Sequence, residues 1–384
     1  MAKTTIKKKK NSFWQSGKLD ITFLSFVLIL LTIGLVMLFS ASYAYSYENY
    51  GNSYKFIVRQ ALFAAVGIGV MFFTSRINYH FWRRISWLVF IGTIIILFIL
   101  LIVPPMVSGM SVKRWFAIGP ISFQPSEIAK FAIVVLFSTL IAANQKLMSS
   151  WKFIFFLFFL LGLTCLLVIL EPHISATLLI AAIGVVLIYV GGLNRKVVIF
   201  GIVLAVVGVA LVIFTQSTGF FSYGSSRIKY WLDPWADAKV QGFQTIQSLL
   251  AIGSGGVLGR GIGQSRQKYL WVPEPHNDFI FSIVCEELGL IGAVVIILLF
   301  ALLVWRGFTI AMRAKDKFGS MLALGLTFQV GLQAMLNIWV VTNTIPNTGI
   351  SLPFFSYGGT SLLILLAEMG IILSVSRESN IEKS

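Results

Sequence analysis

The chain alternates between long apolar runs and short polar segments. Each run is close to the roughly 20 residues that a helix needs to cross the hydrocarbon core of a membrane. The runs are continuous, whereas the strands of a membrane barrel would alternate between apolar and polar positions. The pattern therefore predicts an all-α, polytopic integral membrane protein with about ten transmembrane helices, near residues 20–42, 56–74, 86–103, 127–143, 153–170, 174–192, 197–214, 279–305, 319–341 and 357–375.

The weakest boundary is the polar break Glu171-Pro172-His173. One long kinked helix across this break would lower the number of crossings by one. The first run is longer than the roughly 7–15 residues of a signal-peptide core, so we expect a retained helix. Residues 20–376 then form a single transmembrane domain between a basic tail at 1–19 and a short tail at 377–384.

Composition excludes the other broad classes of protein. The chain is 57% hydrophobic and 11% charged, whereas a soluble domain carries about 25% charged residues. A disordered chain would need low hydrophobicity. Both cysteines, Cys165 and Cys285, lie in apolar runs, so a disulfide framework is not indicated.

The formal net charge of +16 indicates membrane topology and contact with anionic lipid rather than nucleic acid. With the N-terminus inside, the inner segments hold 19 Lys and Arg residues and the outer segments hold 10. This asymmetry predicts that both termini are cytoplasmic. We expect the basic tail, with Lys3 and Lys7 to Lys10, to bind anionic lipid of the inner leaflet.

Residues 215–278 form a long outer loop between the seventh and eighth runs. Long loops in compact proteins are usually functional or disordered, and the many aromatic residues of this one disfavour disorder. Within it, residues 242–252 carry apolar side chains at helical spacing. They predict a short amphipathic helix along the outer interface.

Some carboxylates lie in or beside the apolar runs, where an ionised group costs about 2.5–3.5 kcal/mol to insert. We expect these to face a polar cavity or a partner: Glu127, Glu171, Asp278, Glu286, Glu287 and Glu368. Others lie at chain ends or in short loops and are predicted to be solvated surface: Asp20, Glu48, Asp316, Glu378 and Glu382.

Glu127 and Lys130 are three residues apart at the outer start of the fourth run, a spacing that places them on one helix face. Ser126 is a good N-cap for this helix. The pair is either a structural ion pair that makes burial tolerable or a direct substrate contact. Arg114 and Trp115 precede it in the same outer loop, as an interfacial anchor or a second substrate contact.

Asp278 is the best single candidate for chemistry. It lies where the long loop meets the eighth run, with Glu274 and His276 beside it. One reading is a carboxylate that is favoured by the helix dipole; the other is a general base at the mouth of a membrane groove. The same loop carries cations that suit phosphate oxygens or are simply solvated: Arg227, Lys229, Arg260, Arg266 and Lys268.

Nucleotide and metal motifs are missing. The glycines of residues 253–263 do not form G-x-G-x-x-G, and there is no P-loop. By the predicted topology, His80 is inside while His173 and His276 are outside, so no His-rich metal site is indicated. If the protein is an enzyme, its energy must arrive in an activated substrate.

Motifs along nearly the whole chain resemble, in order, those of the SEDS family (shape, elongation, division, sporulation). Within this family they are more similar to the division and sporulation branches, FtsW and SpoVE, than to the elongation branch, RodA. The motifs are Phe123–Lys130, Asp233–Asp237, Gly242–Ser248, Gly261–Lys268, Pro273–Phe281, Glu286–Gly289 and Leu352–Ser361.

The resemblance implies a peptidoglycan glycosyltransferase that polymerises lipid II on the outer face of the cytoplasmic membrane. It implies a class B penicillin-binding transpeptidase as partner, in the company of other membrane proteins of the division machinery. The presumed catalytic aspartate of the family corresponds to Asp278. The resemblance places substrate contacts at Glu127, Lys130, Arg114, Trp115 and Arg227, and we add Arg266, Lys268, Glu274, His276 and Ser356.

Two positions depart from the family pattern. Many members have Asp where this chain has His173, and Gly-Thr where it has Ser175-Ala176. Many division members have Lys where this chain has Thr348. The first departure argues against an acidic role at residue 173, and the second is shared with sporulation and elongation members.

Polymerisation of lipid II needs a lipid-facing groove for the polyprenyl tail, positive charge for the diphosphate, and a base for the acceptor hydroxyl. Arg227, Arg266, Lys268 and Arg114 are the candidate cations, and a bound divalent cation is an alternative source of charge. No other cofactor is implied. A lipid II flippase and a non-catalytic scaffold that activates the transpeptidase stay as alternative functions.

Overall fold

The structure is a computed structural model of the 384-residue chain. It describes residues 13–14, 17–103, 114–118, 121–193, 229–240, 242–269 and 274–379. The helix predicted at 197–214 and the candidate residue Arg227 lie outside the described residues.

Within the described residues, nine helices are long and apolar enough to cross a membrane, which confirms the predicted class. Their positions follow nine of the ten predicted runs. They are α1 (Ile21–Tyr50), α2 (Lys55–Arg76), α3 (His80–Ile102), α4 (Pro125–Ala143), α5 (Trp151–Leu170), α6 (Ile174–Gly191), α10 (Ile280–Met312), α11 (Lys317–Val341) and α12 (Gly359–Glu378).

Short elements connect these helices. The predicted amphipathic helix is present as α9 (Phe243–Gly255), which packs against α10. A small antiparallel hairpin, β1 (Phe116–Ile118) and β2 (Ile121–Phe123), is the one exception to the all-α prediction among the described residues. The described residues also contain two 3₁₀ turns, η1 (Gln145–Ser149) and η2 (Pro234–Asp237).

The break at residues 171–173 separates two helices, α5 and α6, so the alternative of one long helix is wrong. Pro172 has no N–H to donate to a continuing helix and its ring clashes with the preceding turn. A different helix, α10, contains a kink that hydropathy does not reveal. Gly289 within it has φ of 68°, and a Cβ there would collide with the backbone of Gly259 in the preceding loop.

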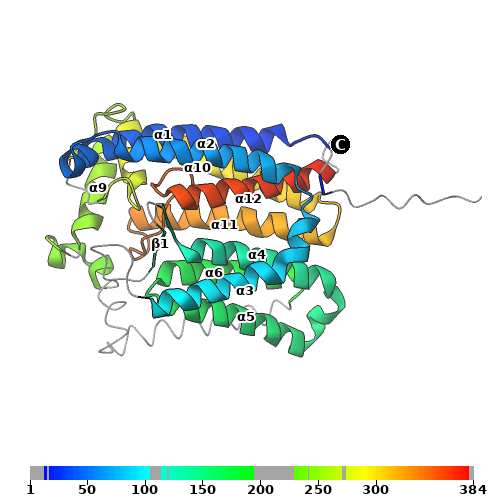
Figure 1. Ribbon diagram of the computed structural model, residues 1–384. Coiled ribbons are helices and arrows are strands. Elements are labelled where there is room, and N and C mark those ends of the chain that lie inside the picture. The colour runs from blue at the N-terminus through cyan, green and yellow to red at the C-terminus, as the bar shows by residue number, and fades with distance from the viewer. Residues whose placement is uncertain are drawn as a thin grey trace, which may run out of the picture.

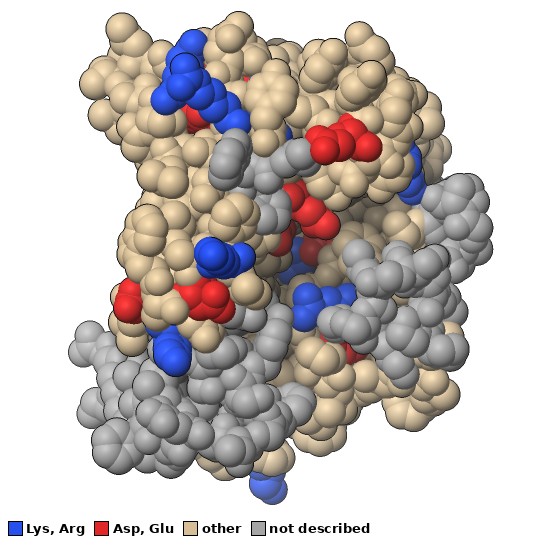
Figure 2. All heavy atoms as spheres, turned by 90° about the vertical axis from the view of Figure 1, so that its left-hand side faces the viewer, with Lys and Arg blue, Asp and Glu red and all other residues tan. Residues whose placement is uncertain are grey.

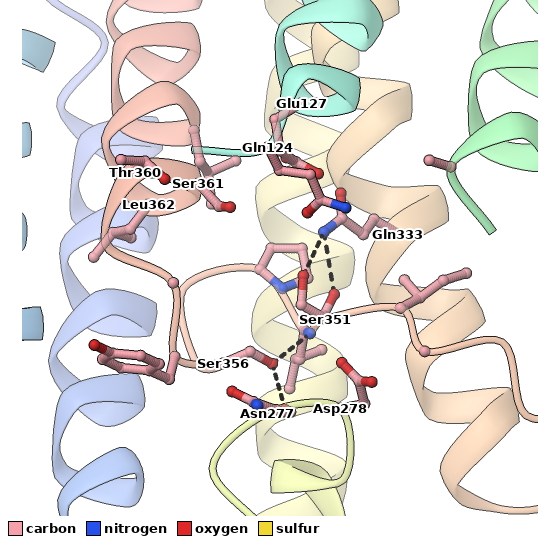
Figure 3. Close-up of a pocket in the computed structure, with 18 of the residues that line it drawn as sticks. Gln124, Glu127, Asn277, Asp278, Gln333, Ser351, Ser356, Thr360, Ser361 and Leu362 are labelled. Atoms are coloured by element: carbon pink, nitrogen blue, oxygen red, sulfur yellow. Dashed lines mark hydrogen bonds between the residues drawn. The ribbon is translucent and has the colours of Figure 1, made fainter. Parts of the chain in front are cut away.

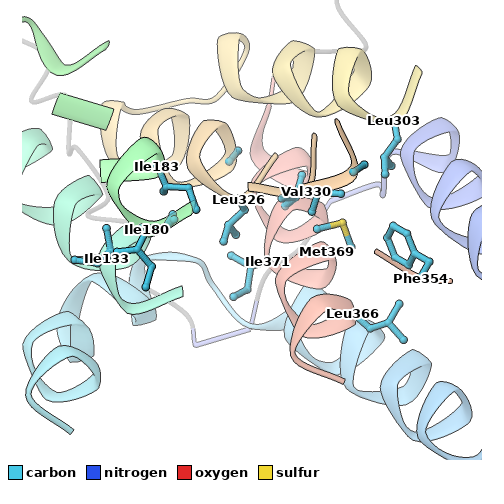
Figure 4. Close-up of a cluster of buried hydrophobic side chains, with 14 of the residues drawn as sticks. Ile133, Ile180, Ile183, Leu303, Leu326, Val330, Phe354, Leu366, Met369 and Ile371 are labelled. Atoms are coloured by element: carbon cyan, nitrogen blue, oxygen red, sulfur yellow. The ribbon is translucent and has the colours of Figure 1, made fainter. Parts of the chain in front are cut away.

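Figure 1 shows the spanning helices side by side. The helices α1, α2, α10, α11 and α12 lie together, and α4 and α6 join α3 and α5 to them by packing against α11. The core between these helices is filled by branched aliphatic side chains and a few larger ones (Figure 4): Ile133, Ile180, Ile183, Leu303, Leu326, Val330, Phe354, Leu366, Met369 and Ile371.

The two ends of the bundle differ. The hairpin and α9 lie at one end, which we call the loop end, and the described chain termini lie at the other, the terminal end (Figure 1). At the terminal end, Arg377 of α12 donates a hydrogen bond to the carbonyl of Gly17 at 2.6 Å. The start and the finish of the described chain are thereby tied together.

The prediction that Asp20 is solvated is wrong. Its carboxylate caps α1 by accepting a hydrogen bond from Phe23 N at 2.9 Å, and it pairs with Arg306 Nη2 of α10 at 2.8 Å. The side chain of Asp20 is only 2% exposed. A short polar segment looks like surface in the sequence, but a partner 286 residues away covers it.

We expect Asp20→Ala to lower the free energy of unfolding by at least about 1 kcal/mol, the typical worth of a helix N-cap. The loss of a partner for Arg306 adds to this cost. Thermal unfolding in detergent measures the change, with Glu48→Ala as the control because Glu48 is exposed at the far end of α1. Equal unfolding temperatures for the two variants would contradict the expectation.

Candidate functional site

A cavity of about 650 Å³ lies at the loop end. Helices α2, α4, α6, α11 and α12 supply its walls, together with residues 274–278 before α10 and residues 349–358 between α11 and α12. Figure 2 looks onto this end and shows a hollow that contains atoms of acidic and basic side chains. The cavity therefore offers charged groups to a ligand inside a protein that is otherwise apolar.

Lys130 lies at the inner part of the cavity and is 1% exposed. Its ammonium pairs with Glu127 Oε1 at 2.8 Å and donates a hydrogen bond to Gln333 Oε1 of α11 at 2.9 Å. The predicted pairing of Glu127 with Lys130 is therefore present. Gln333 continues the network, since its Nε2 donates to the carbonyl oxygen and the hydroxyl of Ser351 at 3.1 and 3.2 Å.

Glu368 of α12 is a second buried carboxylate that lines the cavity. It accepts hydrogen bonds from Gln329 Nε2 at 3.0 and 3.2 Å. Two carboxylates and one ammonium thus share the inner part of the cavity. This agrees with the expectation that Glu127 and Glu368 face a polar cavity or a partner, whereas Glu171 does not line the cavity.

Asp278 lies at the outer part of the cavity, two residues before α10 begins. Figure 3 shows its carboxylate near Asn277 and Ser351, with Glu127 and Gln124 further along the cavity. Asn277 Nδ2 donates to Glu274 Oε2 at 2.8 Å, and both side chains line the cavity. The candidate base therefore faces the same space as the Glu127–Lys130 pair.

Three cations line the cavity in the described part of the chain: Arg59, Arg114 and Lys130. Arg114 stands before the hairpin, with Trp115 also on the cavity wall, and it donates a hydrogen bond to the carbonyl of Pro172. Arg59, in the second turn of α2, was not among the predicted site residues. An arginine near the start of an apolar helix was the signal that could have found it.

The sequence reasoning also missed a row of amides on α11. Gln329, Gln333 and Asn337 are spaced by four residues, which places them on one helix face. Each bonds to a different wall of the cavity: Gln329 to Glu368, Gln333 to Lys130, and Asn337 to the carbonyl of Asp278 at 2.8 Å. Buried amides at this spacing in a run of only moderate hydropathy were the available signal.

Two predicted site residues lie away from the cavity, in the segment 256–269. Lys268 is 3% exposed, and its ammonium bonds to Glu287 Oε1 and Ser40 Oγ, each at 3.1 Å. Arg266 is exposed, and its backbone N–H donates to Glu286 Oε1 at 2.9 Å. Glu286 and Glu287 therefore face a partner, as expected, but this partner is the loop itself.

His276 also lies outside the cavity, whereas Ser356 lines it. The imidazole of His276 is packed among the rings of Tyr45, Phe56 and Tyr357, with centroid distances of 4.9, 4.3 and 5.9 Å. A ring held in this way supports the loop that carries Asp278. It does not face the space that a substrate would occupy.

Helix α4 begins one residue earlier than its predicted cap. Gln124 is the N-cap residue, without a side-chain hydrogen bond, and Pro125 opens the helix. Proline suits the first helical position because its missing N–H would have no partner there. Ser126 is therefore not the cap, and its hydroxyl instead faces His173 Nδ1 at 3.3 Å.

No group of three or more His, Cys, Asp or Glu side chains that could hold a metal ion occurs in the described ranges. A divalent cation carried by a diphosphate stays a hypothesis. The cations that face the cavity are side chains of α2, α4 and the segment before the hairpin.

The comparisons with known proteins agree with this arrangement. The family model for FtsW, RodA and SpoVE, described as "Cell cycle protein", matches residues 21–381. The chain belongs to this family. Its architecture is the one that the SEDS motifs imply, and they place it with the FtsW and SpoVE branches.

Stage V sporulation protein E of Bacillus subtilis is 38% identical over 361 residues, which cover 94% of this chain and 97% of that protein. The probable peptidoglycan glycosyltransferase FtsW of Geobacter sp. strain M18 is 36% identical over 360 residues, covering 93% of this chain and 96% of the relative.

Solved structures of the family share the fold. A chain from a study titled "Structural coordination of polymerization and crosslinking by a peptidoglycan synthase complex" has a TM-score of 0.79 at 26% identity. It covers 94% of this chain and 99% of its own length. The crystal structure of Thermus thermophilus RodA has a TM-score of 0.67 at 23% identity, over 94% of this chain and 98% of that one.

The structure shows the surroundings of His173, which the family resemblance singled out. Gln124 Nε2 lies 3.1 Å from its Nδ1, and the ring lines the cavity. Burial, and then the charges of Arg114 and Lys130, lower the pKa of His173 to about 3. Burial raises the pKa of the adjacent Glu171 to about 8, although Arg114 opposes the shift. Burial therefore favours the neutral forms of both side chains in this turn.

Acid is expected to destabilise the fold through His276. Burial lowers its pKa from 6.5 to about 4. Between these two values the unfolded chain binds a proton that the folded chain does not, so the free energy of unfolding falls as the pH falls. His276→Phe keeps a ring among the aromatic neighbours and removes the part of this dependence that comes from His276, while the part from His173 stays. Unfolding temperatures at about pH 7 and about pH 5 test this, and equal drops in wild type and variant would contradict it.

Proposed function

We propose that the chain is a peptidoglycan glycosyltransferase that polymerises lipid II, with the loop end outside the cytoplasm. The observation that carries the proposal is one cavity that holds both a candidate base, Asp278, and three cations, Arg59, Arg114 and Lys130. Relatives named as probable peptidoglycan glycosyltransferases align over nearly the whole chain. A base and an anion-binding group within one cavity are the two requirements of this reaction.

In the reaction, the sugar 4-hydroxyl of the acceptor attacks the anomeric carbon of the donor. A glycosidic bond forms, the bond from that carbon to the diphosphate breaks, and the hydroxyl proton passes to the Asp278 carboxylate. Polyprenyl diphosphate leaves. Because the donor is already activated, one carboxylate is enough, and the paired carboxylates of glycosidases are not required.

The cations bind the diphosphate as negative charge develops on it. Arg59 and Arg114 present planar guanidinium groups that suit phosphate oxygens. Lys130 is already paired with Glu127. Its role is therefore to stabilise the inner wall of the cavity and to add to the positive potential inside it. The raised pKa of Glu171 weakens the competition of its carboxylate with the diphosphate for Arg114. In this account Arg59 replaces Arg266 and Lys268, which lie outside the cavity.

The proposal also covers the orientation of the protein in the membrane, its partner and its cellular pathway. The split of basic residues supports cytoplasmic termini, so the terminal end would face the cytoplasm, and we propose that Lys3 and Lys7 to Lys10 bind anionic lipid of the inner leaflet. A class B penicillin-binding transpeptidase is the proposed partner, supported by the synthase complex in which a structural relative occurs. Septal wall synthesis is the proposed pathway, supported by relatives named FtsW, and sporulation is the alternative that the stage V relative supports.

We expect purified protein in detergent, given labelled lipid II and the transpeptidase, to form glycan polymer. Asp278→Asn keeps the shape of the side chain and removes the base, so polymer should fall at least about 100-fold, the usual cost of losing a general base. Gel separation of the products measures it. Polymer at the normal rate from Asp278→Asn would remove this residue as the base. No polymer from wild type would favour the flippase or the scaffold, and a lipid II translocation assay in vesicles separates those two.

Arg59→Ala should raise KM for lipid II about tenfold or more, because a charged hydrogen-bond partner of the diphosphate is lost. Arg59→Lys should recover only part of the affinity, since an ammonium cannot bind two oxygens in the same way. Arg84→Ala is the control, because Arg84 is exposed at the terminal end of α3. Unchanged kinetics in Arg59→Ala would assign the diphosphate to other groups.

A further inference from the structure

Three consecutive backbone carbonyls lead into the candidate base, and each accepts a hydrogen bond from the C-terminal part of the chain. His276 O accepts from Tyr357 N at 2.9 Å, and Asn277 O accepts from Ser356 Oγ at 2.8 Å. Asp278 O accepts from Asn337 Nδ2 at 2.8 Å. Residues 276–278 precede α10 and belong to no helix or strand. These three contacts therefore fix their backbone.

Asn337 joins two segments through one nitrogen atom. Its Nδ2 donates to Asp278 O and, at 2.6 Å, to Ile350 O in the segment between α11 and α12. The residue is fully buried on α11, while its Oδ1 has no hydrogen-bond partner. An unpaired buried acceptor costs free energy. The two hydrogen bonds that Nδ2 donates, to Asp278 O and Ile350 O, therefore explain why an amide occupies this position.

Ser356 holds the neighbouring carbonyl in a similar way. Its hydroxyl donates its single proton to Asn277 O, and its oxygen accepts a hydrogen bond from Leu352 N at 2.7 Å. The segment that carries it is anchored in turn by Gln60 of α2, which bonds to Ser356 O at 3.3 Å and to Gly358 N at 3.2 Å. Ser356 thus lines the cavity but has no hydroxyl proton left for a substrate.

Gly349 completes the arrangement beside the carboxylate itself. A Cβ at this residue would lie 3.2 Å from Asp278 Oδ2, and apart from Gly349 itself and its two chain neighbours no other heavy atom comes within 4 Å of that point. Its φ of 69° also favours glycine. The next residue, Ile350, is the one whose carbonyl Asn337 holds. The same amide therefore ties the backbone of Asp278 to the backbone of the residue that follows Gly349.

We propose that Asn337 and Ser356 are positioning residues that hold the Asp278 carboxylate in its reactive place against Gly349, without touching the substrate. The inference rests on the proposed function, because it assigns these residues to the base of that reaction. A displacement of about 1 Å at a reacting group costs on the order of 100-fold in rate. Losing the hydrogen bond of Asn337 or Ser356 to this backbone should therefore lower kcat and leave KM for lipid II unchanged.

Asn337→Leu is the first test. Leucine keeps the branched shape of the side chain and removes the unpaired Oδ1, but the carbonyls of Asp278 and Ile350 lose their donor. We expect kcat for lipid II polymerisation to fall about 100-fold and KM to stay close to that of wild type, while the unfolding temperature falls because two carbonyls lose their donor. An unchanged kcat would overturn the proposal, and so would a rise in KM at constant kcat, because that result would place Asn337 on the substrate.

Ser356 gives a second test that does not depend on how Asn337→Leu folds. Ser356→Ala should lower kcat roughly tenfold at constant KM, and Ser356→Thr, which keeps the hydroxyl, should restore it. The control is Ser374→Ala, because Ser374 is also buried and also donates to a backbone carbonyl, that of Ile77, near the terminal end. Equal kcat values for Ser356→Ala and Ser374→Ala would overturn the proposal.

Gly349→Ala and Gly51→Ala form a matched pair. Both glycines have positive φ, 69° and 65°, so both variants carry a similar backbone cost. A Cβ at Gly51 would meet nothing within 4 Å, whereas one at Gly349 would meet only the Asp278 carboxylate. We expect similar unfolding temperatures and a lower kcat in Gly349→Ala alone. Equal kcat values would overturn the proposed contact. An inactive wild type would instead reject the proposed function and not the positioning.

Discussion

The Lys130 ammonium is buried in the middle of an apolar bundle, and much of the site follows from how it is compensated. A charge removed from water is tolerated only when it is paired and hydrogen-bonded. Glu127, one turn earlier, and Gln333, from α11, meet that requirement. Because Gln333 also bonds to Ser351, the same interaction ties α4 and α11 to the segment between α11 and α12. The groups that compensate the charge of Lys130 therefore also join the elements that form one wall of the cavity.

Helix α11 is the element that distributes these contacts. Its three amides at positions 329, 333 and 337 reach Glu368, Lys130 and the Asp278 backbone in turn. Amides suit this task because each offers a donor and an acceptor without a charge of its own. The carboxylates of the cavity can therefore keep fixed places in a setting where a loose polar group would be costly.

The buried charges outside the cavity hold the loop before Asp278 in place. Lys268 and Glu287 are as deeply buried as Lys130, yet with Ser40 they fasten the loop before Asp278 onto α1 and α10. Glu286 accepts hydrogen bonds from the backbone of the same loop. Removing one partner of such a pair is costly, since the other charge is left buried. Intramembrane charge therefore marks both the cavity and its scaffold, and position along the chain does not separate the two.

Hydropathy alone determined the class of the protein and the positions of nine helices among the described residues, because the length of an apolar run is a local property. It left open whether the break at residues 171–173 separates two helices, and the structure decided that. Spacing along one helix likewise predicted that Glu127 lies beside Lys130. The sequence did not predict features that depend on contacts across the bundle. These are the pairs of Asp20 with Arg306 and of Lys268 with Glu287, the kink at Gly289, and the position of Arg59 on the cavity wall. Each depends on which helices become neighbours. Apolar runs of similar length and hydrophobicity do not encode that order, so only packing in three dimensions decided which buried charges face the cavity and which hold the scaffold.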